Sequence, residues 1–260
     1  MALAKFWLVV VGCFALAGCG QPDQASPRIA AAADLRLVLT QVATAFERDT
    51  GLKVALVFGS SGNFHQQLQQ GAPFELFLSA DEQYVLDLAD TGRTQDRGRL
   101  YAVGRIALIA PKGSPLVVDG DLAGLRDALA RGQISRFAIA NPDHAPYGRR
   151  AQEALEYAGL WQGLQGRLVM GENVSQALQF ATDGGAQGGI VAWSLVQDPA
   201  LASRADHALI PAQWHQPLRQ RMVLMNGAGD TARRFYAYLG EPPARTIFVR
   251  YGFALPDELN

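Results

Sequence analysis

The feature that most constrains this chain is an alternation of short apolar runs with stretches of helical periodicity. Residues 28–33 form a small apolar run, and apolar residues then recur at helical spacing until Gly51, a residue suited to end a helix. Apolar runs follow at 52–58 and 74–78, and a helical stretch at 64–70 separates them. Strands that alternate with helices over short connections are typical of a parallel sheet covered by helices on both faces. The sequence therefore predicts an α/β fold.

The second half of the chain repeats this alternation after a break. A continuous apolar strand at 105–110 precedes the run 111–115, which contains two prolines and a glycine, and we expect the chain to pass between domains here. Ser79 to Glu82 is predicted as a capping box. Further strands are expected at 136–140, 167–170, 188–193 and 222–225, and further helices at 82–91, 122–130, 149–157, 174–181, 231–238 and 244–250. The expected domains are two lobes, residues 27–104 with 222–260, and residues 105–221.

The N-terminus has the pattern of a secretory leader. Residues 1–18 contain one lysine and an apolar stretch too short to span a membrane with this flank, and we expect a signal peptide. The sequence Leu-Ala-Gly-Cys, which ends at Cys19, resembles the bacterial lipobox, so Cys19 is the expected site of lipidation and residues 19–26 a tether. The alternative is an ordinary signal with an incidental cysteine. Since Cys13 and Cys19 are the only cysteines, the mature chain would have neither a free thiol nor a disulfide.

Charge excludes one class of partner. Without the leader, 22 basic residues face 24 acidic ones, a balance of −2, and no basic stripe or charge block stands out. This argues against binding to nucleic acid. If the ligand is an anion, local geometry must hold it, because the surface does not attract it.

Polar donors stand where predicted strands run into predicted helices. Residues 59–63 supply two glycines, two serines and an asparagine at such a turn, and Asn173 is an expected helix cap. The unpaired N–H groups of a helix start favour an anion, although a serine or asparagine there can also simply cap the helix. Ligands of α/β sheets bind at the carboxyl ends of strands. The site is therefore expected at the turns that contain Asp34, Ser61, Tyr147 and Val174.

Catalysis and metal binding are weaker interpretations. Residues 59–62 do not match the Gly-x-Ser-x-Gly motif of a nucleophile elbow, and no His or Asp partner is placed for Ser61. The four histidines lack the i, i+4 spacing of a helical metal site: His65, His144, His207 and His215. We therefore predict neither an enzyme nor a resident cofactor.

Five separated blocks carry a resemblance to a known family. They are residues 28–35, 58–63, 71–81, 141–146 and 247–253, and together they resemble the periplasmic molybdate-binding proteins of bacterial ABC transporters. The resemblance implies a type II periplasmic-binding-protein fold, with two lobes of mostly parallel sheet flanked by helices and joined by two crossing strands. It also implies capture of molybdate, and of tungstate, by a monomer that delivers it to an inner-membrane permease and its ATPase. With a lipid on Cys19, the protein would be a membrane-anchored periplasmic lipoprotein.

The resemblance assigns the oxyanion contacts to five positions: Asp34, Ser61, Tyr147, Val174 and Ala192. It implies that Ser61 offers its hydroxyl and N–H, and that Val174 offers an N–H at a helix start. Some members of the family have a tyrosine where this chain has Ala192, so the lost phenolic donor is expected at Tyr147 or at the neighbouring Trp193. Asp34 stands where some members have a serine.

A carboxylate at Asp34 would repel a dianion in a closed site. We expect the Asp34 side chain to turn back and cap its own helix while its N–H serves the ligand. The alternative is that it stays in the site and accepts a proton, which would favour an oxyanion that carries hydrogen. Other functions left open are a receptor for phosphate, sulfate or chromate, and a sensory lipoprotein without a role in transport.

Overall fold

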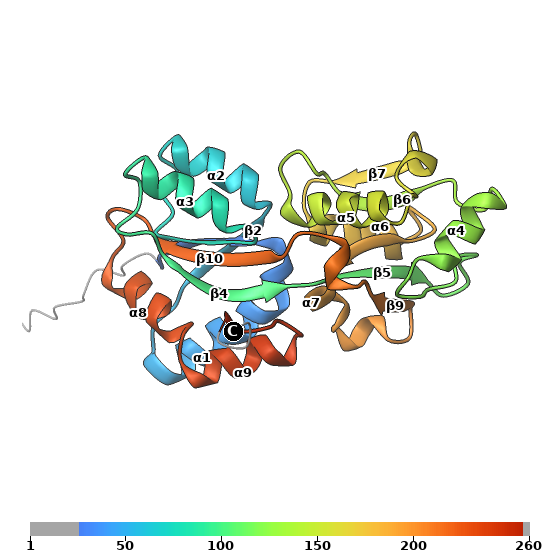
Figure 1. The fold of residues 1–260 in the computed structure, drawn as a ribbon. Coiled ribbons are helices and arrows are strands. Elements are labelled where there is room, and N and C mark those ends of the chain that lie inside the picture. Colours follow the sequence, from blue (N-terminus) through green and yellow to red (C-terminus); the bar gives the residue numbers. More distant parts are fainter. Residues whose placement is uncertain (1–25, 257–260) are drawn as a thin grey trace, which may run out of the picture.

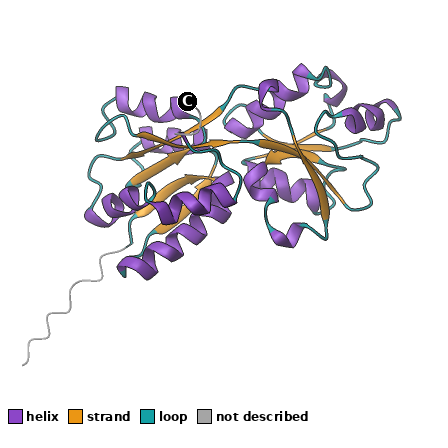
Figure 2. Cartoon of the chain, turned by 60° about the horizontal axis from the view of Figure 1, so that its bottom comes forward, coloured by secondary structure: helices purple, strands orange, loops and turns teal. Residues whose placement is uncertain are grey.

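The protein consists of two lobes that lie side by side (Figure 1). The computed structural model describes residues 26–256, so the signal peptide predicted at 1–18, most of the tether at 19–26 and the lipidation of Cys19 lie outside the described residues. Each lobe contains a five-stranded sheet, and helices flank both sheets (Figure 2). The prediction of a two-lobed α/β fold is therefore confirmed.

The first lobe contains a sheet of order β2-β1-β3-β10-β4. Strand β10 is antiparallel to both of its neighbours, whereas β1 pairs in parallel with β2 and β3. The helices α2 and α3 lie on one face, and α1, α8 and α9 lie on the other (Figure 1). The bounds of the strands are β1 Arg28–Ala32, β2 Ala55–Gly59, β3 Leu76–Ser79, β4 Arg99–Gly104 and β10 Leu218–Leu224. The bounds of the helices are α1 Arg36–Thr50, α2 Ser61–Gln69, α3 Glu82–Asp90, α8 Asp230–Tyr238 and α9 Pro242–Arg250.

The second lobe contains a sheet of order β7-β6-β8-β5-β9. Here β5 is the antiparallel strand, and β6 pairs in parallel with β7 and β8. The bounds of the strands are β5 Ile106–Pro111, β6 Phe137–Ala140, β7 Leu168–Gly171, β8 Gly189–Ala192 and β9 Ala205–Leu209. The bounds of the helices are α4 Ala123–Ala130, α5 Pro146–Tyr157, α6 Val174–Thr182 and α7 Trp193–Val196, with short 3₁₀ turns η1 Ala33–Leu35, η2 Gln162–Leu164, η3 Pro199–Leu201 and η4 Ala212–Trp214.

The chain crosses between the lobes twice. Strand β4 runs through Gly104 and Arg105 into β5, and the segment after β9 returns to β10 (Figure 1). The return strand begins at Leu218, earlier than the start expected at residue 222. The strands β4 and β9 were not predicted, and no strand was predicted at residues 218–221. In β10 the side chains of Leu218, Gln220 and Met222 are buried and alternate with two half-buried arginines. That period of two is typical of a strand, but the polar residues within it hide the pattern.

One helix start differs in detail from the sequence prediction, and another agrees with it. The helix α3 is capped by the side chain of Asp81, which accepts a hydrogen bond from the Gln83 N–H, and not by Ser79. Ser79 instead bonds to the backbone of Asp81. In contrast, the cap predicted at Asn173 is confirmed, because its Oδ1 accepts from the N–H groups of Ser175 and Gln176.

None of the helices between residues 26 and 256 combines the length and hydropathy that a membrane-spanning segment requires.

The core of the first lobe lies on both faces of its sheet. Under α2 and α3, the aromatic rings of Phe64, Phe74 and Phe77 pack together at one face. On the other face, the ring of Phe46 from α1 contacts Phe235 and Tyr238 from α8 edge-on. These contacts join α1, the first helix of the lobe, to α8, which follows the second lobe in the sequence.

We therefore expect the Phe46→Ala variant to lose about 3 to 5 kcal/mol of unfolding free energy, since the side chain is 1% exposed and its removal leaves a cavity. Urea denaturation followed by circular dichroism measures this loss. The Val249→Ala variant is the control, because Val249 is 48% exposed on α9. An equal loss in both variants would contradict this account of the core.

Candidate functional site

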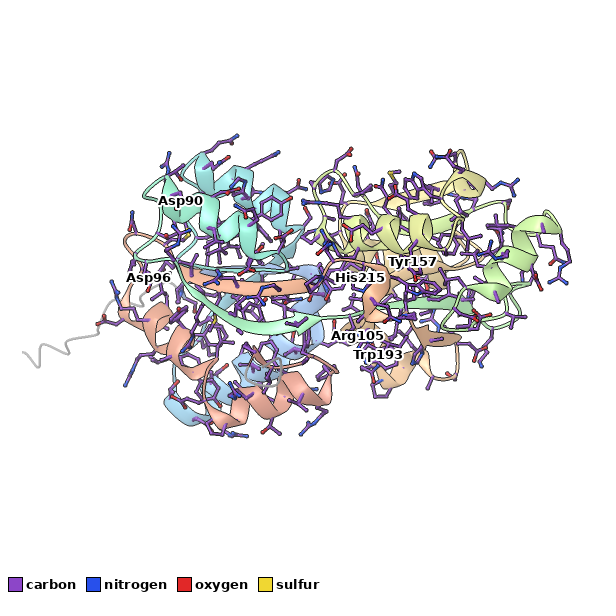
Figure 3. The ribbon with its side chains drawn as sticks, in the orientation of Figure 1. Asp90, Asp96, Arg105, Tyr157, Trp193 and His215 are labelled. Atoms are coloured by element: carbon purple, nitrogen blue, oxygen red, sulfur yellow. The ribbon has the colours of Figure 1, made fainter. Side chains whose placement is uncertain are left out.

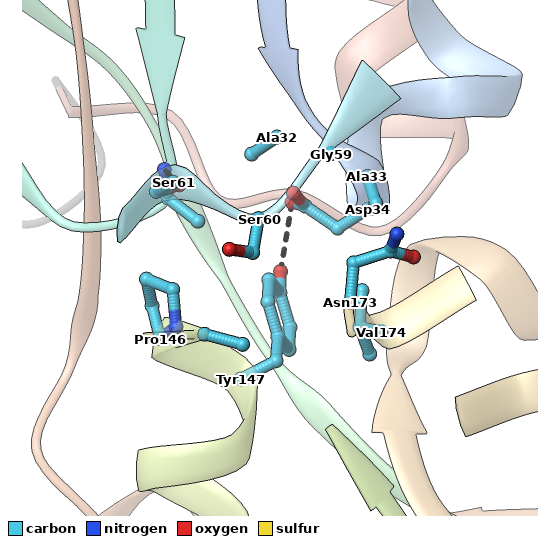
Figure 4. Close-up of a pocket in the computed structure, with 12 residues that line it drawn as sticks. Ala32, Ala33, Asp34, Gly59, Ser60, Ser61, Pro146, Tyr147, Asn173 and Val174 are labelled. Atoms are coloured by element: carbon cyan, nitrogen blue, oxygen red, sulfur yellow. Dashed lines mark hydrogen bonds between the residues drawn. The ribbon is translucent and has the colours of Figure 1, made fainter. Parts of the chain in front are cut away.

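A small cavity lies where the two lobes meet, at the carboxyl ends of parallel strands. Its volume is about 10 Å³ for the centres of water-sized atoms, close to the minimum that holds one water molecule. None of the lining residues is a lysine, arginine or histidine. They are Ala32, Ala33, Asp34, Gly59, Ser60, Ser61, Ala80, Ala145, Pro146, Tyr147, Asn173 and Val174 (Figure 4). A larger hollow of about 240 Å³ shares Gly59, Ser60 and Asn173 with this cavity.

The structure brings together four of the five predicted site residues. Asp34, Ser61, Tyr147 and Val174 line the cavity, and each follows a parallel strand: β1, β2, β6 and β7 respectively. Ala192 is not among the lining residues; it is buried at the end of β8 and pairs with Ile106. Contact of Ala192 with the ligand therefore stays a prediction that the lining of this cavity does not support.

Trp193 does not replace the missing tyrosine at Ala192. Its ring packs edge-on against His207, and its backbone N–H donates to the Arg105 carbonyl at 2.9 Å. In the molecule Trp193 lies beside Arg105, near the crossing between the lobes (Figure 3). Trp193 does not line the cavity, so its indole N–H does not contribute to the donor set.

Helix starts supply backbone donors to the cavity. Ser61 begins α2, Tyr147 lies in the first turn of α5, and Val174 begins α6. The first N–H groups of a helix have no intrahelical acceptor. The N–H groups of these three residues form no hydrogen bond within residues 26–256. Unpaired donors and the positive ends of three helix dipoles therefore converge on one small space, which is the arrangement that binds an anion.

The Ser61 hydroxyl adds to this donor set, whereas the Ser60 hydroxyl is engaged by neighbouring residues. The Ser61 oxygen accepts a hydrogen bond of 3.0 Å from the Ala80 N–H, which leaves its own hydrogen available to donate. The Ser60 oxygen caps α2 by accepting from the Asn63 N–H at 3.2 Å, and it lies 2.9 Å from Nδ1 of His144. Both side chains are buried, so their orientation is set by these contacts before any ligand arrives.

Asp34 does not cap its helix, and the expectation that it turns back is wrong. Neither the 3₁₀ turn at Ala33–Leu35 nor α1 has a side-chain cap, because the Asp34 carboxylate is held by residues from other elements. Its Oδ2 accepts a hydrogen bond of 2.9 Å from the Tyr147 hydroxyl and one of 2.7 Å from Nε2 of Gln220. Figure 4 shows this hydrogen bond between Asp34 and Tyr147, both of which line the cavity.

Burial raises the pKa of Asp34 from its ordinary value of 3.8 to about 6, although the hydrogen bonds from Gln220 and Tyr147 oppose this rise. The side chain is fully buried, and its Oδ1 has no hydrogen-bond partner in the described part of the chain. The phenolic donor that we expected Tyr147 to offer to the ligand is engaged by Asp34 in this structure. The same burial raises the pKa of Tyr147 well above 10, so its hydroxyl stays protonated.

Direct contacts between the lobes close the cavity. The Gly62 N–H of the first lobe donates to the His144 carbonyl of the second at 3.0 Å. Further bonds across the gap join Asn63 to Glu172 at 3.3 Å and the Ser175 hydroxyl to the Ala33 carbonyl at 2.9 Å. Direct hydrogen bonds therefore hold the two lobes together around the cavity.

Several residues of the site were missed by sequence reasoning. Gln220 lies before the strand expected at residues 222–225 and donates to the Asp34 carboxylate, and Ser194 of α7 donates to the Asp34 carbonyl at 2.8 Å. His144 was considered only as a metal ligand, yet it contacts Ser60 from the opposite lobe. Within residues 26–256 no group of three or more His, Cys, Asp and Glu side chains is placed to hold a metal ion.

Comparison with known proteins agrees with this architecture. A family model described as bacterial extracellular solute-binding protein matches residues 27–254. The chain is 35% identical over 251 residues to the molybdate-binding protein ModA of Azotobacter vinelandii, a match that covers 95% of this chain and 96% of that protein. It is 31% identical over 261 residues to ModA of Escherichia coli (strain K12), with 97% of this chain and 100% of that protein covered. The structure of the Azotobacter vinelandii periplasmic molybdate-binding protein matches with a TM-score of 0.81 and 30% identity, covering 89% of this chain and 100% of that one.

The buried carboxylate makes stability depend on pH. The pKa of Asp34 in the folded protein, about 6, lies above its ordinary value of 3.8. Ionisation of the buried carboxyl group therefore does not lower the unfolding free energy below pH 3.8, and it lowers the unfolding free energy by the full amount above pH 6. We expect the Asp34→Asn variant to exceed the wild type in unfolding free energy by up to about 3 kcal/mol at pH 8 and by little at pH 4. Urea denaturation at both pH values tests this, with the exposed Asp127→Asn as control. A difference that does not change with pH would contradict the assignment.

Proposed function

Because the chain belongs to the family of bacterial extracellular solute-binding proteins, we propose that it captures molybdate, and also tungstate, in the periplasm and delivers it to an ABC permease. The proposal draws on the relatives described above and on the chemistry of the cavity. No bond of the ligand is made or broken in this function. The protein acts as a receptor that closes round an ion.

The observation that carries the proposal is the convergence of unpaired donors from both lobes on a cavity without cationic side chains. The Ser61 N–H and hydroxyl come from the first lobe, and the Tyr147 and Val174 N–H groups come from the second. Molybdate and tungstate are fully deprotonated near neutral pH and offer only acceptors, so they suit a set of donors. Neutral dipoles held in a dry site stabilise a charge without the need to desolvate a lysine or arginine.

Closure of the lobes completes the donor set. The ligand contacts are divided between the lobes, and the crossing segments β4 to β5 and β9 to β10 are the connections about which the lobes move apart. An ion that bridges both lobes binds the closed arrangement better than the open one, so it shifts the population toward closure. The closed surface, built from both lobes, is then what a permease recognises.

The location of the protein follows from its family and from its leader. Solute-binding proteins of this family act outside the cytoplasm, and we place this one in the periplasm, anchored by a lipid on Cys19. The anchor is proposed from the Leu-Ala-Gly-Cys sequence alone. Residues 19–26 would then be the tether that lets the folded body reach a membrane partner as a monomer.

Isothermal titration of the chain without its leader against molybdate, tungstate, sulfate and phosphate tests the proposal. We expect molybdate and tungstate to bind more tightly than sulfate and phosphate, because the fixed positions of the donors select an ion by size. Tighter binding of phosphate, sulfate or chromate would assign the site to that oxyanion instead. Absence of binding to every oxyanion would refute the function.

The Ser61→Ala variant removes one hydroxyl donor, and we expect it to weaken molybdate binding by about 10- to 100-fold, as for a lost hydrogen bond to a charged group. The matched control is Ser114→Ala in the second lobe. Ser114 also accepts a backbone N–H, from Leu116, but it lies far from the cavity, so its loss should leave the dissociation constant unchanged. Equal affinities of the Ser61→Ala variant and the wild type would exclude Ser61 from the donor set.

The Gly62→Ala variant separates closure from stability. A Cβ at Gly62 would overlap with the His144 carbonyl oxygen and approach the Tyr84 hydroxyl to 2.9 Å, so the lobes could not close fully. Within α2 the same change favours the helix by up to about 1 kcal/mol. We expect at least tenfold weaker molybdate binding with no loss of unfolding free energy. The control is Gly163→Ala, whose Cβ would meet only the Leu129 side chain, at an ordinary contact distance of 3.9 Å. Unchanged binding would show that this contact is not part of closure.

A further inference from the structure

The polar groups beneath the cavity all donate toward one oxygen atom. The Tyr101 hydroxyl donates to Oε1 of Gln220 at 2.7 Å, and Nε2 of Gln220 donates to Oδ2 of Asp34 at 2.7 Å. The Tyr147 hydroxyl, from the other lobe, donates to the same Oδ2. The second carboxylate oxygen, Oδ1, is buried and has no hydrogen-bond partner among residues 26–256, in a side chain that lines the cavity. The network therefore leaves one oxygen of Asp34 able to carry a proton.

A charged Asp34 and a dianion are incompatible in so small a space. The cavity has no cationic side chain in its lining to separate the two charges, and like charges at contact distance repel strongly where little water screens them. If Oδ1 carries a proton, the repulsion disappears and the carboxyl group becomes a donor. Oδ2 still accepts from Tyr147 and Gln220 in that state, so the network is preserved.

We propose that the site takes up one proton with each oxyanion dianion it binds, and that this proton resides on Oδ1 of Asp34, which then donates to the ligand. The inference rests on the proposed function, because it concerns the same cavity. It adds Asp34 to the donor set as a neutral carboxyl group. It also makes affinity depend on pH in a range where molybdate itself does not titrate.

Other titratable groups around Asp34 do not replace it in this role. Tyr101 of β4 and Tyr147 of α5 face it, and burial raises the pKa of both well above 10, so they stay neutral. His144, before α5, contacts Ser60 and lies 3.8 Å from Glu172. The charged side chains of the surrounding elements face other partners. Arg36 stacks on Phe58 and Arg99 on Tyr236. The remaining contacts are those of Arg149 with Asp81 and Tyr84, of Arg150 with Glu153, and of Arg219 and Arg221 with Glu82.

The titration of Asp34 sets the pH range of the effect. Burial holds the pKa of Asp34 in the empty closed site at about 6, and a bound dianion raises it further. At a pH between the pKa of Asp34 in the empty site and its pKa in the occupied site, binding is accompanied by proton uptake. In this range the dissociation constant rises about tenfold for each pH unit. Below pH 6 the carboxyl group is already neutral, and affinity no longer depends on pH through this group.

Calorimetric titration of the chain without its leader with molybdate tests the proposal. Titrations at pH 6, 7 and 8 give the dissociation constant, and titrations at pH 8 in two buffers of different ionisation enthalpy give the number of protons exchanged. We expect the dissociation constant to rise by about 50-fold from pH 6 to pH 8, because Asp34 is half ionised at pH 6, with about one proton taken up per site at pH 8. A dissociation constant that is independent of pH, with no proton uptake, would overturn the proposal while leaving molybdate capture intact.

Variants assign the proton to a residue. Asp34→Asn keeps the shape and an amide donor without a titrating group, so we expect it to bind molybdate at pH 8 at least tenfold more tightly than the wild type and without proton uptake. The exposed Asp127→Asn variant should keep the full pH dependence. His144→Gln should also keep it. If the pH dependence survives in Asp34→Asn and is lost in His144→Gln, the proton belongs to the interlobe contact of His144 and the proposal is wrong. No binding by wild type at any of these pH values would instead refute the proposed function.

Discussion

The N–H groups that open each helix cannot bond within that helix, and the fold gathers them in one place. A parallel strand must be followed by a crossover, so each helix of this kind begins at the carboxyl edge of its sheet. Two sheets that face each other at those edges bring the starts of α2, α5 and α6 to one cavity, beside the end of β1. The site is therefore a direct consequence of the topology. Side chains such as Ser61 refine a donor set that the backbone already supplies.

Local sequence signals predicted most of this arrangement because they act locally. A donor at a helix start, such as Asn173, is stabilised by N–H groups two and three residues away, so its role can be inferred without knowledge of the fold. Periodicity of apolar residues located the central strands for the same reason. The outer strands β4 and β9 were missed, and β10 was recognised only in part, since its buried Gln220 makes sense only beside Tyr101 and Asp34.

Asp34 shows where local reasoning fails. Aspartate favours the start of a helix, but here burial and two donors from distant segments of the chain decide its position. A buried carboxylate with one oxygen that accepts no hydrogen bond is unfavourable for folding. Residues that are unfavourable for folding often have a role in ligand binding. The bond from Tyr147 also joins the lobes, so the same group connects the chemistry of the site to the position of one lobe against the other.

The double crossing of the chain has a consequence for the order in which the protein is made. Strand β10 lies between β3 and β4, yet it is separated from them in the sequence by the whole second lobe. As the polypeptide emerges from the ribosome or the export channel, the second lobe can assemble while β3 still exposes the edge that β10 will cover. The lobe that begins first is thus completed last. Until the C-terminal segment arrives, an uncovered strand edge must be kept from pairing with other nascent chains.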